Sequence, residues 1–430
     1  MPGEESYLII GGCGFLGRWI VDQLVERGET KVAVFDIVQR HFDNNITFFT
    51  GDLSNAADVE NAIVKSGATS IIHTASPHYT APADILERVN VTGTSNVVDM
   101  CLKHNVRKLV YTSSGAVYLD GIHQLISADE RLDYAEKPLD VYNTTKIEAE
   151  KIVLNANDRS GEGLLTCCIR PCGIFGPGDQ NNIKQWHRVV LNGQTKWQIG
   201  DNMNINDFTF VGNVARAHIL ASDRLAESYP CDRFRDPLPS IDLSVGERRV
   251  PTSEARPLGP NTSPSEKDLE VAKRFASKEY DPNDLRPVLR NRMDHFSEQS
   301  NLEDESASVP VAGQAYFVTN GEPVYFWDFA RTVWKHFGPL PTSYWVLPVA
   351  LGYIVGLLSE TFAKISGRQP GMTRYNISQV VQNRYFSIEK SRRLLGYEPT
   401  VGIQEGIQLM ADWYKEELAK KGEPESKKSR

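Results

Sequence analysis

Three side chains within the first 150 residues could together remove a proton from an alcohol. Tyr142 and Lys146 are four residues apart, and this spacing places two side chains on one face of a helix, one turn apart. An ammonium group beside a phenol favours the phenolate, so we expect Lys146 to lower the pKa of Tyr142 from about 10. Ser114 lies upstream in the run Thr-Ser-Ser and could bind the oxygen that Tyr142 deprotonates. Because a Tyr and a Lys four residues apart also occur by chance on helix surfaces, this interpretation depends on the motifs around them.

A glycine-rich segment near the N-terminus has the spacing of a dinucleotide-binding loop. Gly11, Gly14 and Gly17 follow a short apolar run and precede a helical pattern. The first glycine makes the tight turn, the second lets the backbone approach a pyrophosphate, and the third lets helix and strand pack closely. The helix N-terminus then offers unpaired N–H groups to the phosphates. We expect Phe15 and Leu16, which begin that helix, to line the same site.

Further cofactor contacts are expected where later strands end, because open α/β sheets bind ligands at that edge. Asp36 comes nineteen residues after Gly17, and a carboxylate there accepts both ribose hydroxyls of NAD and repels a 2′-phosphate. This favours NAD, while the nearby Arg40 keeps NADP as an alternative. The competing interpretation of Asp36 is a solvated carboxylate at the end of a strand that binds no ligand. The other predicted contacts at strand ends are Asp52, Leu53, Thr74, Ala75, Ser76 and Ser113.

The elements that must position these residues alternate between two kinds of pattern. Segments with helical spacing, such as Leu16, Ile20 and Leu24, separate short runs of apolar and β-branched residues. Such alternation predicts parallel strands joined by crossovers, hence an α/β fold with a Rossmann-type doubly wound parallel sheet over residues 1–180. The predicted strands are 7–10, 32–35, 46–49, 70–73, 109–112 and 164–169.

The rest of the chain is predicted to form an insertion and a smaller lobe. Residues 231–310 contain 9 of the 23 prolines and 28 charged residues. This composition buries too little apolar surface to offset the entropy of ordering, so we predict a disordered insertion with local helical character near 266–275. A strand-like run resumes at 314–319. The remaining predicted parts are 181–230 with 311–415, a C-terminal substrate-binding lobe, and 416–430, a charged tail.

The segment 339–359 has no charged residue across 21 positions. A straight membrane span needs roughly 20 apolar residues, so the segment is marginal, and it also contains prolines. Three interpretations are open: a buried core helix, an element that dips into one leaflet, and a true span. The rings of Tyr344, Trp345 and Tyr353 favour the membrane–water boundary, so we expect attachment to one leaflet.

Composition restricts the function classes. The chain has 430 residues, 40% hydrophobic and 24% charged residues, and a net charge of −8, which excludes collagen and coiled coil and gives no global basic surface for nucleic acid. Six cysteines without a CxxC pair favour a reducing compartment over a disulfide scaffold or a zinc site. Cys167, Cys168 and Cys172 are expected to be core residues. The N-terminus lacks the features of a signal peptide, so we expect the catalytic part to face the cytosol.

Ten stretches together carry a resemblance to a known family. They are LIIGGCGFLG, GDLSNAADVENAI, VNVTGTSNVVDMC, LVYTSSGAVY, YNTTKIEAE, RPCGIFGPGDQ, GQTKWQIGDNMN, VGNVARAH, YFVTNGEPVYFWDFARTVW and LLGYEPTVGIQEGI. The chain resembles an extended short-chain dehydrogenase/reductase of the 3β-hydroxysteroid dehydrogenase family over about residues 1–225 and 313–412. More narrowly, it is similar to the fungal branch that oxidises and decarboxylates sterol 4α-carboxylates, and the part from 193 to 218 is specific to that branch.

The resemblance implies a role for each motif residue. Tyr142 is the catalytic acid/base, and Lys146 is its partner and also contacts the nicotinamide ribose. Ser114 is the anchor of the substrate hydroxyl, with Ser113 as the competitor for that role. The insertion departs from the shorter family pattern, and Phe208 stands where the family often has Trp, so both changes concern the substrate lobe. The loop that resembles the one against the nicotinamide contains Pro171, Cys172, Gly173 and Ile174.

The activity implied is NAD(P)-dependent oxidation of the 3β-hydroxyl of a sterol or triterpenoid 4α-carboxylate, followed by loss of CO₂ and without a metal. Alternatives without decarboxylation are a 3β-hydroxysteroid dehydrogenase/isomerase and a ketoreductase. A nucleotide-sugar epimerase suits the apolar segment poorly, and a nucleotide sensor without turnover commonly lacks the Tyr or the Lys. The expected partners are a membrane surface, a C4-methyl oxidase and a 3-keto reductase. Lys427 and Lys428 resemble a dilysine signal, with a solvated basic tail as the alternative, and the expected location is the cytosolic face of the endoplasmic reticulum membrane.

Overall fold

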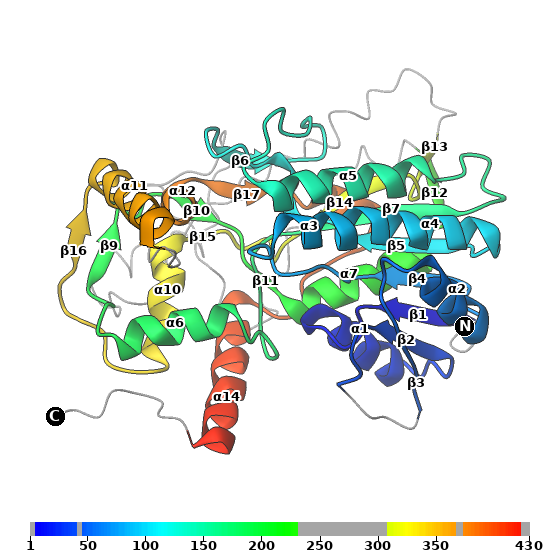
Figure 1. Cartoon of the computed structure of the whole chain (residues 1–430), viewed down its shortest axis with the longest axis horizontal. Coiled ribbons are helices and arrows are strands. Elements are labelled where there is room, and N and C mark those ends of the chain that lie inside the picture. The colour runs from blue at the N-terminus through cyan, green and yellow to red at the C-terminus, as the bar shows by residue number, and fades with distance from the viewer. Residues whose placement is uncertain (1–4, 41–44, 231–307, 367–372, 423–430) are drawn as a thin grey trace.

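A seven-stranded parallel sheet forms the centre of the structure, a computed structural model that describes residues 5–40, 45–230, 308–366 and 373–422. The strand order is β14-β7-β5-β4-β1-β2-β3, and every neighbouring pair is parallel (Figure 1). The order reverses beside β1, which is the point where a doubly wound sheet binds its ligand. The strands are β1 (Tyr7–Ile10), β2 (Val32–Asp36), β3 (Thr47–Thr50), β4 (Ser70–His73), β5 (Lys108–Thr112), β7 (Leu165–Pro171) and β14 (Gln314–Val318).

All six strands predicted in the N-terminal part are present, and so is the strand predicted at 314–319. Their ends agree with the prediction to within two residues. The Rossmann-type doubly wound sheet is therefore confirmed. The helices of this part are α1 (Phe15–Glu26), α2 (Ala56–Ser66), α3 (Ala83–Leu86), η1 (Glu87–Thr92), α4 (Gly93–Lys103), η2 (Gly115–Tyr118), α5 (Val141–Asn155) and α7 (Val211–Arg224).

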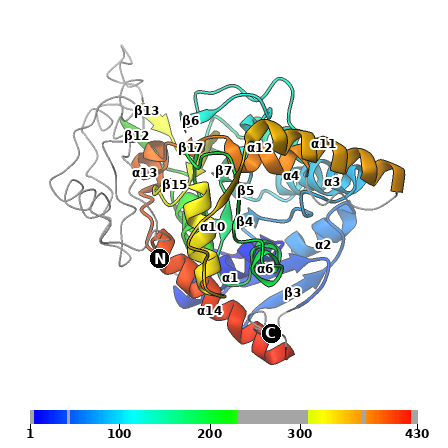
Figure 2. The same ribbon diagram turned by 90° about the vertical axis from the view of Figure 1, so that its left-hand side faces the viewer.

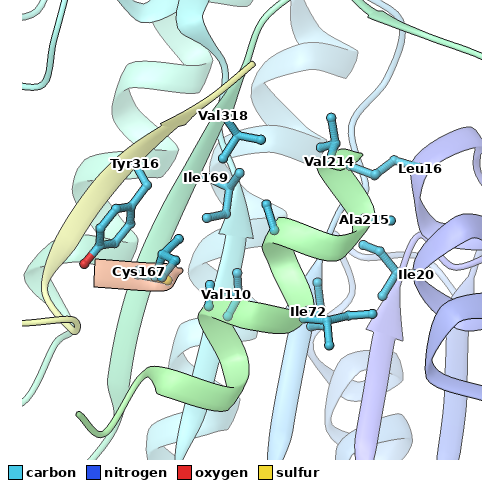
Figure 3. Close-up of a cluster of buried hydrophobic side chains, with 14 of the residues drawn as sticks. Leu16, Ile20, Ile72, Val110, Cys167, Ile169, Val214, Ala215, Tyr316 and Val318 are labelled. Atoms are coloured by element: carbon cyan, nitrogen blue, oxygen red, sulfur yellow. The ribbon is translucent and has the colours of Figure 1, made fainter. Parts of the chain in front are cut away.

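Helices cover both faces of this sheet, which is why most side chains of its inner strands are apolar and buried. Leu8 and Ile10 of β1 point to the face covered by α2, α4 and α5, whereas Ile9 points to the face covered by α1 and α7. Figure 3 shows that second core, in which Leu16 of α1 meets Val214 of α7 above the strands. The two cores hold the strand ends rigidly, and the polar residues at those ends are fixed with them.

The predicted boundary at residue 180 differs from the structure. Strand β14 pairs with β7, and α7 packs on α1 and on the sheet, so two segments beyond residue 180 complete the central layers. The physical reason is that β7 would otherwise be an edge strand, and β14 satisfies its free backbone groups.

The smaller lobe is built from short strands and longer helices around a hydrophobic core of its own. Its largest sheet has the order β15-β10-β17-β6. Figure 2 views the lobe from its own side, where α10 lies beside α14. The lobe elements are β6 (Leu125–Ala128), β8 (Ile174–Phe175), α6 (Asn182–Leu191), β9 (Trp197–Ile199), β10 (Ile205–Asn206), β11 (Thr209–Phe210), β15 (Val324–Tyr325), α10 (Phe326–Lys335), β16 (Trp345–Leu347), α11 (Val349–Ser366), α12 (Arg374–Val381), β17 (Arg384–Phe386) and α14 (Ile403–Lys421). Helix α13 (Glu389–Leu395) packs on β14 and α7 of the central part.

The predicted insertion lies almost wholly outside the described residues, as do the predicted helix near 266–275 and the two lysines near the C-terminus. Its two flanks meet: β12 (Ser228–Pro230) pairs antiparallel with β13 (Ser308–Pro310). The described chain therefore stops and resumes at neighbouring positions, Pro230 and Ser308.

The apolar segment 339–359 forms β16 and most of α11. Gly352 and Gly356 face inward, and a Cβ at Gly356 would lie 3.0 Å from the backbone nitrogen of Arg374 in α12. The two helices approach closely through these glycines, while the leucine and isoleucine side chains of α11 stay exposed. A buried core helix, one of the three interpretations, is therefore excluded. Nowhere in the described ranges does a helix combine the length and apolar character needed to cross a bilayer.

Candidate active site

The glycine loop connects β1 to α1 in a conformation that only glycine tolerates at two positions. Gly11 has a φ of 81°, in the left-handed region. A Cβ at Gly17 would lie 2.1 Å from the carbonyl oxygen of Gly11. Gly14 is the N-cap of α1 and provides no side-chain cap, so the first N–H groups of the helix remain for a ligand. The loop therefore fits a pyrophosphate.

Asp36 ends β2 beside this loop. Its Oδ2 accepts a hydrogen bond from the N–H of Cys13 at 2.9 Å, and its Oδ1 accepts one from the N–H of Ile37 at 2.8 Å. These bonds orient the carboxylate, which has lone pairs left for ribose hydroxyls. Arg40 lines the same cavity, so the two residues named for the choice between NAD and NADP both face the ligand space.

Tyr142 and Lys146 both lie on α5, one turn apart. Asp140 caps this helix, because its Oδ1 accepts a hydrogen bond from the N–H of Asn143 at 2.8 Å. The cap begins the helix directly before Tyr142. The spacing of four thus places both side chains toward the cavity, which they line together.

Ser114 lies in the loop after β5 and reaches Tyr142. Burial raises the pKa of Tyr142 to about 12, and a hydrogen bond with the Ser114 side chain lowers it by less. The expectation of a lowered pKa is wrong for the protein chain alone, because removal of the phenol from water outweighs its polar partner. Ser114 Oγ also accepts a hydrogen bond from the N–H of Ala116 at 3.1 Å. Ser113, the competitor, is only 3% exposed.

Lys146 is buried and held by two oxygen acceptors. Its Nζ donates to the hydroxyl of Tyr111 at 2.8 Å and to the backbone oxygen of Thr112 at 2.6 Å. Burial lowers the pKa of Lys146 to about 7. A cation held here, next to the phenol-bearing face of α5, would stabilise negative charge that develops on Tyr142.

Three residues that hold Lys146 directly or through a neighbour were not predicted as site residues: Tyr111, Thr112 and His218. Thr112 is fixed through its Oγ1, which lies 2.7 Å from Nε2 of His218. The other ring nitrogen of His218 lies 2.8 Å from the backbone oxygen of Val214, so Nδ1 carries the proton and Nε2 accepts from Thr112. Burial lowers the pKa of His218 to about 4, which keeps it neutral. Tyr111 and Thr112 end β5, directly before Ser113 and Ser114, so their position beside the serines could have identified them. His218 comes from α7, and no pattern in the sequence connects it with the serines.

One cavity of about 1440 Å³ joins all the predicted site residues. It exceeds the roughly 300–1,000 Å³ of a typical small-molecule pocket and therefore has room for a dinucleotide and a second ligand. The role of each residue stays a prediction, but their convergence is a fact of the structure. The predicted residues that line it are Gly11, Gly14, Phe15, Leu16, Gly17, Asp36, Asp52, Leu53, Thr74, Ala75, Ser76, Ser113, Ser114, Tyr142, Lys146, Pro171, Cys172, Gly173 and Ile174.

The part of the cavity that lies in the lobe has a group of aromatic and aliphatic side chains beside polar ones such as Asn376 and Gln379. Trp186 of α6 and Trp327 and Trp334 of α10 line it, together with Ile199 of β9 and Val380 of α12. None of these was predicted as a site residue. The run YFWDFARTVW contained the signal, but its aromatic residues have the spacing of ordinary core residues. A cavity lined in this way accepts a large hydrophobic ligand.

The three cysteines in and after β7 are buried, and one of them, Cys172, also lines the cavity. Cys167 and Cys168 lie fully buried in β7. Burial raises the pKa of Cys172 to about 12, so its thiol stays protonated and is no nucleophile at neutral pH. Within the described residues, no three side chains of His, Cys, Asp or Glu are grouped to hold a metal ion.

The family comparison matches most of the chain outside the insertion. A model described as the 3-beta hydroxysteroid dehydrogenase/isomerase family matches residues 8–235 and 294–349. Solved structures share the fold at low identity. The chain is similar to gox2253 with a TM-score of 0.61 at 19% identity, covering 96% of this chain and 99% of that one. It is similar to the UDP-glucose 4-epimerase of Thermotoga maritima with a TM-score of 0.58 at 15% identity and the same coverage.

Curated relatives are similar over nearly the whole chain. The sterol-4-alpha-carboxylate 3-dehydrogenase ERG26, decarboxylating, of Saccharomyces cerevisiae is 36% identical and covers 97% of this chain and 100% of its own length. Its counterpart in Candida albicans is 34% identical, with coverage of 96% and 99%. The human sterol-4-alpha-carboxylate 3-dehydrogenase, decarboxylating, is 30% identical, with coverage of 93% and 86%. Together with the family match, these similarities show that the chain is an enzyme that belongs to the 3-beta hydroxysteroid dehydrogenase/isomerase family.

Proposed function

We propose that this enzyme oxidises the 3β-hydroxyl of a sterol or triterpenoid 4α-carboxylate with NAD and releases the carboxyl group as CO₂. The observation that carries the proposal is that Ser114, Tyr142 and Lys146 line one cavity, which continues from the glycine loop to the tryptophans of the lobe. The names of the relatives support the choice of substrate.

NAD, when bound, supplies the hydride acceptor. The residues present fit it: the absence of a Cβ at Gly17 lets α1 pack directly against the backbone of the glycine loop, and the oriented carboxylate of Asp36 suits ribose hydroxyls. Asp36 favours NAD over NADP because a 2′-phosphate beside it would be repelled. Arg40 keeps some use of NADP open.

In the proposed reaction Ser114 and Tyr142 bind the 3-hydroxyl oxygen. Tyr142 takes the hydroxyl proton as the hydride leaves C3, so the C3–O bond becomes a carbonyl. Lys146, held by Tyr111 and Thr112, stabilises the phenolate that this step requires. Because burial raises the pKa of Tyr142, the phenolate depends on that positive charge and on the cationic cofactor ring.

The oxidised product carries a ketone next to the carboxylate, which makes the second step easy. The bond between C4 and the carboxyl carbon breaks, CO₂ leaves, and the electron pair of the bond passes into the C3 carbonyl as an enolate. A proton then returns to C4 or to the enolate oxygen. Donors that hold the carbonyl oxygen, here Ser114 and Tyr142, stabilise that enolate.

Product analysis tests the proposal. The purified enzyme is incubated with NAD and a 3β-hydroxysterol 4α-carboxylate labelled with ¹³C at the carboxyl group. We expect NADH and ¹³CO₂ in equal amounts and a 4-decarboxylated 3-ketone by mass spectrometry. NADH without ¹³CO₂ would instead favour a dehydrogenase or dehydrogenase/isomerase that does not decarboxylate. Absence of both products would refute the proposal. A parallel assay with a triterpenoid acid shows which of the two substrate classes the enzyme turns over faster.

We also propose that the exposed face of α11 attaches the enzyme to one leaflet of a membrane, at the cytosolic side of the endoplasmic reticulum. Leu358, Phe362 and Ile365 are 64%, 64% and 80% exposed, and their spacing puts them on one side of the helix. Trp345 of β16, 57% exposed, continues this surface. The paired strand β9 contributes Trp197 to the cavity lining. We infer that an apolar substrate enters the cavity from the lipid near this pair of strands.

Vesicle flotation tests the attachment. The triple variant Leu358→Asp, Phe362→Asp, Ile365→Asp should lose binding to phosphatidylcholine vesicles, because it places three charges in the interfacial face. The matched control is Leu409→Asp, at a position 41% exposed on α14, which should bind like the wild type. Equal flotation of the triple variant and the wild type would remove α11 from this role. The expected C4-methyl oxidase and 3-keto reductase partners remain predictions.

A further inference from the structure

We propose that Arg384 binds the carboxylate of the substrate, and that this ion pair selects an acid over the corresponding neutral sterol. The inference rests on the proposed function, because it assigns a residue to the carboxyl group of that substrate. Nothing in the sequence motifs singled out this residue, which comes from β17 in the C-terminal lobe.

The cavity offers few cations for this task. Among the described residues that line it, the only lysines and arginines are Arg40, Lys146 and Arg384. Arg40 follows Asp36 and therefore lies at the adenosine end of the cofactor site. Lys146 already donates to Tyr111 and Thr112. Arg384 is the remaining cation.

The guanidinium of Arg384 is only partly satisfied by the protein. Its Nη1 donates to Oε1 of Gln379. Its Nε is shielded from solvent and has no hydrogen-bond partner. Within the described ranges no acidic side chain forms an ion pair with it. A positive charge beside a partly apolar cavity is unfavourable without a counter-ion, and a bound carboxylate would supply one.

Arg384 lies at the catalytic end of the cavity rather than at its far end. Its positive charge lowers the pKa of Cys172 against the larger effect of burial, so it acts on the loop predicted to face the nicotinamide. Two residues along the same strand, the ring of Phe386 would lie 3.1 Å from a Cβ at Gly115. Gly115 directly follows Ser114, so β17 passes beside the loop that holds the substrate hydroxyl.

The chemistry of the proposed substrate fits this placement. Its carboxyl group is attached to C4, the atom next to the reacting C3, so a group that binds it must lie near Tyr142 and Ser114. A guanidinium donates two parallel hydrogen bonds to a carboxylate. Gln379, whose amide oxygen is used by Arg384, and Asn376 also line this part of the cavity and could donate further bonds. A neutral 4-methyl group would leave the guanidinium with Gln379 but without a counter-ion.

A paired-substrate experiment tests the role of Arg384. The full-length wild type and Arg384→Gln are assayed with NAD on a 3β-hydroxysterol 4α-carboxylate and on its methyl ester, which keeps the skeleton and removes the charge. We expect Arg384→Gln to lower kcat/KM for the acid on the order of 100-fold and to change that for the ester less than about threefold. Arg384→Lys, which keeps the charge but loses the paired donors, should give an intermediate value. The control Arg374→Gln alters an exposed arginine that pairs with Glu360 and should match the wild type.

A binding measurement keeps this test separate from that of the proposed reaction. Quenching of tryptophan fluorescence gives the Kd of the acid and of the ester without turnover, since several tryptophans line the cavity. If the wild type releases no CO₂ but Arg384→Gln selectively weakens binding of the acid, the proposed function fails and the role of Arg384 stands. Equal losses for acid and ester, or no loss for the acid, would overturn it.

Discussion

Replacement of Gly17 by alanine should weaken cofactor binding through a displacement of α1. The new Cβ would lie 2.1 Å from the carbonyl oxygen of Gly11 and 2.7 Å from Cα of Gly12, whereas real Cβ atoms essentially never come within 3.0 Å of another heavy atom. Both contacts are backbone atoms, so helix and loop must separate by roughly 1 Å, which takes an N–H donor beyond hydrogen-bonding distance of a phosphate. A lost hydrogen bond to a charged group is worth about 1.5–3 kcal/mol. The Kd for NAD should therefore rise roughly 10- to 100-fold.

Calorimetric titration with NAD measures this change, and thermal unfolding of the same samples reports any loss of stability. The control is Gly338→Ala, where the new Cβ would meet Val190 Cγ1 at 3.4 Å, an ordinary contact remote from the loop. We expect that control to bind NAD as the wild type does. If Gly17→Ala bound NAD with the wild-type Kd, the inference that close packing of loop and helix forms the phosphate site would be wrong.

Three further predictions concern the catalytic residues and the buried charges behind them. Tyr142→Phe should lower kcat by about 10³-fold while leaving the Kd for NAD unchanged, because it removes only the group that carries the proton; activity within tenfold of wild type would remove Tyr142 from this role. Burial lowers the pKa of Lys146 from 10.5 to about 7. Between these pH values the unfolded chain binds more protons than the folded chain, so the contribution of Lys146 to the free energy of unfolding rises with pH. The gain in urea stability of Lys146→Met over the wild type should therefore shrink from about pH 7 to about pH 10, and a constant difference would contradict the lowered pKa. Glu150→Gln should reduce the free energy of unfolding by about 3–5 kcal/mol, because it leaves Arg170, whose Nε lies 3.1 Å from each carboxylate oxygen, buried without its counter-ion; Glu60→Gln, at an exposed pair, should change it little.

The central sheet was predictable because its signals are local. Each of its first six strands is a short apolar run bounded by turn residues or a helix, and burial on both faces makes such runs stand out. The participation of β14 was not predictable, since some 140 residues separate it from its neighbour β7 and no local pattern records that pairing. The strands of the lobe have two to four residues, too few for a periodicity.

The residues that line the glycine-loop end of the cavity could be named from the sequence, although their roles stay predictions, whereas those that line its lobe end could not. Gly11, Gly14, Gly17 and Asp36 have fixed spacings because one turn and one helix must meet one pyrophosphate. Arg384 has no such spacing, as it reaches the cavity from β17, more than 200 residues after Tyr142. The apolar pattern of α11 likewise did not decide between burial and exposure, since both need the same residue types.

By itself, the sequence determined the order of strands and helices, the loop that approaches a phosphate, and the helix that carries a phenol and an amine one turn apart. These features depend on neighbours along the chain, and steric and hydrogen-bonding rules act over those short distances. The tertiary structure decided which acceptors hold Lys146, which face of α11 stays uncovered, and which cation shares a cavity with Tyr142. Those outcomes depend on segments that meet only after folding, where burial and close packing set both the distances and the charges that act across them.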